Sequence, residues 1–137
     1  MPKKKKTYYD YLGKEDHLQK SVCDYVWMRY KVRPIPLNTE GRKTKFEQYK
    51  FKHTGGHRGI PDVLIPKPMG KYGGLFLELK ADGVKIYKED GSYYKANELH
   101  HREQAEYHKG LRINGFQACF VIGFDNARHV IDYYFEL

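Results

Sequence analysis

Two short apolar runs joined by a glycine-rich turn constrain the fold of this chain most strongly. The first run reads Asp-Val-Leu-Ile over residues 62–65, and the second reads Leu-Phe-Leu-Glu-Leu-Lys over residues 75–80. Pro61 fixes the backbone where the first run starts, and the turn at residues 70–74 contains three glycines. Both runs are therefore predicted to be neighbouring strands at the centre of the fold.

Charged side chains interrupt these apolar runs. Because side chains alternate between the two faces of a strand, Glu78 and Lys80 should project to one face while Leu77 and Leu79 pack on the other. A neighbouring strand that begins at Asp62 would bring a second carboxylate beside them. Charges inside an apolar strand are costly unless they are paired or bind a metal.

This set of two acids and a base suits metal-dependent phosphodiester chemistry. Carboxylates supply hard oxygen ligands for Mg2+, which usually binds through one or two of them together with waters and substrate phosphate. The ammonium of Lys80 would orient or activate water, or stabilise charge on the phosphate. A Glu-x-Lys tripeptide alone says little, because about one is expected by chance in such a chain. The alternative is a solvated strand face or a simple Glu78–Lys80 surface pair.

The charge of the chain favours a polyanionic partner. Lys and Arg number 25 against 17 Asp and Glu, which gives a net charge of +8 and a pI near 9.3. Basic residues cluster at residues 3–6, 42–52 and 53–58, with aromatic residues among them. Such clusters are expected to line a groove that follows a nucleic-acid backbone, although residues 3–6 alone are more typical of a solvated tail. Five basic residues are assigned to DNA contact: Arg42, Lys43, Lys45, His57 and Arg58.

The length of 137 residues allows one domain with a single core. We divide the chain into a basic tail, residues 1–13, which is expected to be flexible, and a single domain, residues 14–137. No apolar stretch is long enough to cross a membrane, and the basic N-terminus lacks a following apolar segment. An intracellular location is therefore expected.

Cysteine and histidine do not show the spacing of a zinc site. Cys23 and Cys119 lie among apolar neighbours and are predicted to be buried free thiols. The histidines of two groups are interpreted mainly as loop or groove residues: His53 and His57, then His100, His101 and His108.

Apolar periodicity predicts helices around the two strands. A helix over residues 15–30 carries Leu18, Val22 and Tyr25 at helical spacing. Asn97 is expected to cap a helix that runs to residue 114, and this helix should pack through its apolar residues, Leu99, Tyr107 and Leu111.

Four further elements complete the predicted order. They are an edge strand over residues 35–40, a partly helical basic segment over 41–52, a hairpin over 84–95 and a buried strand over 116–122. Asp125 is expected to cap a last helix over residues 126–135.

Five motifs follow one another in a characteristic order. They are Glu15 and Gln19, Asn-Thr-Glu-Gly-Arg at residues 38–42, Gly-Ile-Pro-Asp at 59–62, Gly-Leu-Phe-Leu-Glu-Leu-Lys at 74–80, and Gln104. Over most of residues 15–135 the chain thus resembles the VRR-NUC domain, a branch of the PD-(D/E)XK nuclease superfamily. Two features depart from the family pattern: the Thr inside the second motif and the length of the hairpin at 84–95.

The resemblance implies a restriction-endonuclease-like α/β fold, with a mixed central sheet flanked by helices and a hairpin inserted near residues 84–95. It also implies hydrolysis of DNA with Mg2+ or Mn2+. The site residues it implies are Asp62, Glu78 and the Leu79 carbonyl as metal ligands, Glu15 completing the metal site, Lys80 assisting the water and Gln104 beside the metal or its water. From spacing alone, Glu15 is only an acid in a first helical turn and Gln104 only a surface amide.

Small proteins that resemble this chain are associated with viral or prophage genomes, and some resolve Holliday junctions. The resemblance therefore points to the cytoplasm of a bacterial host or phage-infected cell. Symmetric cutting of a four-way junction needs two active sites, so a homodimer is expected. The leading interpretation is a metal-dependent, structure-selective DNA endonuclease, with a flap, nick or end-directed repair nuclease and a non-catalytic DNA-binding module as alternatives. Hairpin tyrosines are expected to touch DNA or a second subunit: Tyr87, Tyr93 and Tyr94.

Overall fold

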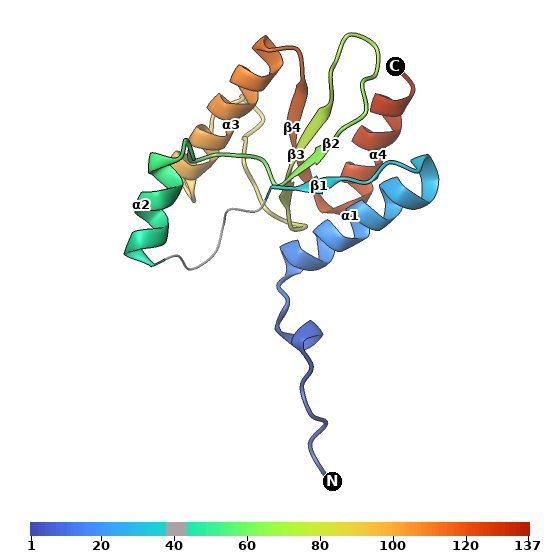
Figure 1. Cartoon of the computed structure of the whole chain (residues 1–137), viewed down its shortest axis with the longest axis vertical. Coiled ribbons are helices and arrows are strands. Elements are labelled where there is room, and N and C mark those ends of the chain that lie inside the picture. Colours follow the sequence, from blue (N-terminus) through green and yellow to red (C-terminus); the bar gives the residue numbers. More distant parts are fainter. Residues whose placement is uncertain (38–43) are drawn as a thin grey trace.

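A four-stranded mixed sheet forms the centre of the computed structural model, which describes residues 1–37 and 44–137 (Figure 1). In spatial order its strands are β1 (Ile35–Pro36), β2 (Val63–Ile65), β3 (Leu75–Lys80) and β4 (Gln117–Ile122). β1 and β3 both run antiparallel to β2, whereas β3 and β4 are parallel. The predicted mixed α/β fold is confirmed.

Helices cover both faces of this sheet. They are α1 (Lys14–Tyr30), α3 (Glu98–Ile113) and α4 (Gly123–Phe135). A further helix, α2 (Lys45–His53), does not cover the sheet, and a short 3-10 turn, η1 (Tyr8–Tyr11), precedes α1. α1 and α4 pack against each other and against one face, while α3 connects β3 to β4 across the other face (Figure 1). α2 lies beyond α3, away from the sheet, and residues 1–13 extend from the body (Figure 1). Within the described residues, no helix has the length and apolar character that crossing a bilayer requires.

The apolar core lies between the sheet and the pair α1–α4. Leu75, Leu77 and Leu79 of β3 are buried there against Val22 and Val26 of α1. Because alternate side chains point to opposite faces, Phe76, Glu78 and Lys80 are left to face α3. The alternation predicted for β3 is confirmed, and its acid and base lie away from this core.

The largest correction concerns the face that α3 presents to the sheet. Leu99, expected to pack inward, is 77% exposed, and Tyr107 and Leu111 are only half-buried. The buried residues of α3 are polar instead: His101, Gln104 and His108. They follow helical spacing, so α3 has one buried face and one exposed face. The buried face carries hydrogen-bonding groups where an apolar stripe would be usual.

Smaller corrections concern where elements begin. α4 starts at Gly123, directly after β4. The chain passes from strand to helix without a loop because Gly123 adopts a φ of 77°, which other residues rarely do. Asp125 therefore lies inside the first turn and is not the cap, and Asn126 Oδ1 accepts the N–H of Ile122 (2.8 Å). Asn97 does precede α3, but its side chain makes no capping bond.

The remaining predicted segments are shorter than expected or lie outside the described residues. β1 covers two residues of the predicted edge strand, and the Asn-Thr-Glu-Gly-Arg motif at 38–42 and the residues Arg42 and Lys43 lie outside the described residues. The segment 84–95 does turn back on itself, through a bridge between Tyr87 and Tyr93 and an N–H bond from Tyr94 to the Ile86 carbonyl (3.0 Å). This hairpin has no regular strands.

The two cysteines are free, as predicted, although each is only half-buried. Burial raises the pKa of both thiols, that of Cys119 to about 11. Both are therefore protonated at neutral pH.

Candidate active site

Strand β3 supplies the centre of the site. Glu78 and Lys80 project toward α3 and are only 2% and 6% exposed. Lys80 Nζ lies 3.5 Å from Glu78 Oε1. This burial shows that the solvated strand face considered as an alternative is wrong. Because burying a charged pair away from water is costly, the pair needs compensating partners.

Gln104 of α3 is such a partner. This residue is fully buried, and its Nε2 donates a hydrogen bond to Glu78 Oε1 (2.5 Å). Its Oε1 is buried and accepts no hydrogen bond from any described residue. The surface position that helix spacing alone allowed for Gln104 is wrong, because the residue is buried against Glu78. The position beside the metal or its water, which the resemblance implies, stays a prediction.

Asp62 reaches the same end of the sheet from the residue before β2. The β2–β3 register would set it opposite Glu78, but its N–H donates to the Leu77 carbonyl (3.0 Å), one residue out of register. Its Oδ2 accepts the N–H of Leu79 (2.7 Å). Since the N–H and C=O of a strand residue face the same neighbour, the Leu79 carbonyl also faces the Asp62 side.

These oxygens fit a hard divalent cation. Two carboxylates and one backbone carbonyl are ligand types that Mg2+ or Mn2+ accepts, with water and phosphate filling the other positions. The buried amide oxygen of Gln104 is an acceptor for such a water. Within the described residues, no three His, Cys, Asp or Glu side chains come together, so Glu15 does not join Asp62 and Glu78 as a third ligand in this structure.

Glu15 lies in the first turn of α1 and is exposed. It stands three and seven residues before the buried Leu18 and Val22, so it continues the inward face of α1. Neighbouring residues Lys14 and His17 line a hollow with Ala81, just beyond the end of β3. The role of Glu15 as a metal ligand therefore stays a prediction.

Two buried histidines of α3, His101 and His108, flank this set. Their interpretation from sequence as loop or groove residues is wrong. Burial lowers the pKa of His101, with Lys80 and His100 adding to the effect. Burial, together with the charges of Arg112 and Lys80, lowers the pKa of His108 to about 4. Both rings are thus neutral at pH 7 and add no positive charge beside Lys80. Their spacing with Gln104 on one helix face was the available signal.

The predicted DNA-contacting residues that the structure describes lie on exposed surfaces. Lys45 begins α2, and the other basic residues of this helix are also exposed. His57 and Arg58 lie beside α3, where Arg58 Nη1 is 4.0 Å from Glu103 Oε1 and the His57 ring centroid is 6.0 Å from that of Tyr107. These side chains are accessible to a polyanion.

Comparison with solved structures shows which fold this chain shares. A solved structure described as a VRR_NUC domain protein matches 92% of this chain and 91% of its own length, with a TM-score of 0.61 and 27% sequence identity. The chain has the VRR-NUC fold. The resemblance carried by the motifs is thereby confirmed at the level of structure. No family model matches the sequence, and no curated protein matches it.

Proposed function

We propose that this VRR-NUC protein is a metal-dependent, structure-selective DNA endonuclease whose preferred substrate is a four-way Holliday junction. Homology to a VRR-NUC domain protein implies a nuclease family and a DNA substrate. The observation that carries the proposal is Glu78, a buried carboxylate held between Lys80 and Gln104. A carboxylate that only stabilised the fold would not need this costly environment, whereas a site for charged chemistry does.

Asp62, Glu78 and the Leu79 carbonyl would hold Mg2+ or Mn2+, with Glu15 as the further acid that the resemblance implies. When bound, the ion would neutralise phosphate charge and make water more acidic. Gln104 fixes the orientation of the Glu78 carboxylate through its short hydrogen bond. Its own amide oxygen would accept a hydrogen bond from water in the site.

The reaction is hydrolysis of a phosphodiester. The oxygen of water bonds to phosphorus, and the bond between phosphorus and one sugar oxygen breaks. One proton of the water ends on the leaving sugar oxygen, and the other remains with or leaves the new phosphate. Lys80 would hold the attacking water or balance charge on the phosphate, because its ammonium is a compact donor beside Glu78.

The net charge of +8 and the exposed basic residues of α2, with His57 and Arg58, would hold the DNA backbone. This binding should weaken as salt increases. Each chain supplies one set of site residues, so paired cuts in a junction require two chains related by a twofold axis.

The test is cleavage of a labelled four-way junction, a flap and a matched duplex, each with Mg2+, Mn2+ or EDTA. Paired metal-dependent cuts in the junction support the proposal. Cuts confined to the flap or duplex keep the nuclease and contradict junction resolution. Background cleavage of every DNA, with binding retained, would favour the DNA-binding module instead.

Asp62→Ala is the diagnostic variant for this test. Cleavage should be lost while binding in EDTA is retained, because a ligand carboxylate repels phosphate when no metal intervenes. Asp125→Ala, which removes an exposed acid of α4, is the matched control and should cleave normally. Equal activity of both variants would contradict the role of Asp62.

A further inference from the structure

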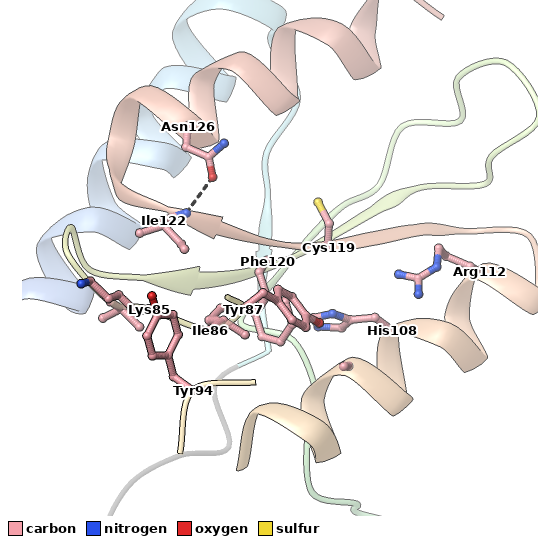
Figure 2. Close-up of a pocket in the computed structure, with 12 residues that line it drawn as sticks. Lys85, Ile86, Tyr87, Tyr94, His108, Arg112, Cys119, Phe120, Ile122 and Asn126 are labelled. Atoms are coloured by element: carbon pink, nitrogen blue, oxygen red, sulfur yellow. Dashed lines mark hydrogen bonds between the residues drawn. The ribbon is translucent and has the colours of Figure 1, made fainter. Parts of the chain in front are cut away.

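A pocket of about 600 Å³ lies between the hairpin at residues 84–95, α3 and β4 (Figure 2). Its walls combine aromatic rings with two cations: Lys85, Tyr87, Tyr94, His108, Arg112 and Phe120. Of these residues, His108 also flanks the candidate active site, and the others lie outside it. The volume suits a small organic group, since ligand pockets typically measure about 300–1,000 Å³.

The pocket adjoins the candidate active site on the same face of the sheet. In the parallel pairing of β3 and β4, Phe120 is the partner of Glu78 and Ile122 is the partner of Lys80. Both β4 residues line the pocket, and neighbouring strands are only about 4.8 Å apart. A group bound there would therefore lie about one strand away from the reacting phosphate.

The hairpin forms an ordered wall of this pocket. Ile86 is 2% exposed and anchors the hairpin, and the N–H of Tyr94 donates to its carbonyl (3.0 Å). The guanidinium of Arg102, on α3, lies 4.5 Å from the ring centroid of Tyr93. These contacts hold the hairpin against α3.

The rings and cations of the pocket match the parts of a nucleotide. The Phe120 ring centroid lies 6.3 Å from that of Tyr87 and 4.7 Å from that of His108. Figure 2 shows Lys85 and Arg112 on opposite sides of these rings. Arg112 Nη1 donates to the Ala118 carbonyl (2.8 Å), and the guanidinium has further N–H groups for a ligand.

We propose that this pocket binds one unpaired nucleotide of the DNA substrate, with the base against the aromatic rings and the two flanking phosphates near Lys85 and Arg112. The ring of His108 adds to this aromatic wall, because it lines the pocket and packs against Phe120. The inference rests on the proposed function and narrows its substrate to DNA whose branch point exposes an unpaired nucleotide.

The test measures binding in EDTA of a short labelled oligothymidylate and of a duplex of equal length. Tyr94→Leu removes a stacking ring and Lys85→Gln removes a cation. Each should weaken binding of the single strand about tenfold and change duplex binding by less than about twofold, because stacking needs an unpaired base. The matched controls Tyr133→Leu and Lys71→Gln remove a Tyr and a Lys that lie outside the pocket, and they should change neither affinity.

Photocrosslinking of 5-iododeoxyuridine in the single strand to the unmutated protein supplies a second measurement. A crosslinked peptide from residues 84–95 or from β4 supports the pocket, and crosslinks confined to other segments overturn it. Unchanged single-strand affinity in the pocket variants, or equal weakening of duplex binding, also overturns it. These two measurements need no cleavage, so they test the pocket even if the protein proves not to be a nuclease. If the protein cleaves DNA but the pocket variants bind the single strand normally, the pocket is rejected and the nuclease proposal is kept.

Discussion

At the scale of single residues, the polar groups between β3 and α3 distinguish this protein from an ordinary sheet–helix packing. Glu78, Lys80 and Gln104 are nearly or fully buried, and Glu78 contacts both of the others directly. Such groups stabilise the fold only when each finds partners, so the loss of one should be felt in stability as well as in activity.

Gln104→Met should lower the free energy of unfolding by about 1.5–3 kcal/mol, because a hydrogen bond to a charged group is lost. Urea denaturation measures this change. Lys109→Met, at an exposed position of α3, is the control and should change stability by about 0.5 kcal/mol or less. Equal effects of the two variants would show that the Gln104–Glu78 bond does not stabilise the fold.

His108 should make stability depend on pH between about 6.5 and 4. Its pKa falls from an unfolded value near 6.5 to about 4 in the folded protein, so the unfolded state binds a proton first as pH decreases. Stability from this group is therefore complete above pH 6.5 and is lost toward pH 4. His108→Leu should flatten this part of a plot of unfolding free energy against pH, whereas exposed His129→Leu should leave the slope unchanged.

At the scale of elements, local sequence patterns predicted the strands better than the packing of the helices. β2 and β3 are found where apolar runs and the bordering Pro and Gly predicted them. The inward face of α3 was assigned to Leu99, Tyr107 and Leu111. The buried residues are instead His101, Gln104 and His108, because this helix faces the charged side of β3. No local pattern reveals which surface a helix will meet.

The loop before β2 requires a glycine at residue 59. Its φ is 88°, and a Cβ there would lie 2.7 Å from the Glu103 carbonyl oxygen of α3. Gly59→Ala should therefore displace the loop that carries Asp62 and reduce cleavage. Gly55 has a φ of 97° but open space around it, so Gly55→Ala introduces backbone strain without a steric clash. Thermal or urea unfolding should show Gly59→Ala to be less stable than Gly55→Ala by at least about 1 kcal/mol; equal stability would contradict the close contact.

A polar link joins α1 to α4. The hydroxyls of Tyr25 and Tyr30 donate to Asp132 Oδ1 at 2.5 and 2.6 Å. Burial and the bond to Asp132 raise the pKa of Tyr25 to about 12, so its contribution is complete below pH 10 and is lost between pH 10 and 12.

Tyr25→Phe should lower the free energy of unfolding by about 1.5 kcal/mol at neutral pH and reduce its decline above pH 10. Chemical denaturation at both pH values measures this effect. Tyr133→Phe, on the exposed face of α4, should match the unmutated protein. A Tyr25 variant as stable as that control would show that the link does not contribute.

At the scale of the whole molecule, the sheet separates a stabilising face from a reactive one. The leucines of β3 pack with α1 and α4, and the charged residues of the same strand face α3. From sequence, Asp62, Glu78 and Lys80 were placed on neighbouring strands by spacing, and Gln104 by the family motif. The contact between Gln104 and Glu78, the out-of-register Asp62 and the pocket beside β4 depend on long-range packing, which spacing along the chain does not encode.

The central claim is that Glu78 belongs to a site that hydrolyses DNA. The most direct test compares metal-dependent cleavage of a labelled branched DNA by the unmutated protein and by Glu78→Gln, with folding of both checked by circular dichroism. We predict cleavage that requires Mg2+ or Mn2+ and that falls at least about a hundredfold in the variant, because losing a residue that only supports a metal ligand already costs about 10–100-fold. Equal cleavage by the folded variant, or no cleavage by the unmutated protein on any branched DNA, would contradict the account.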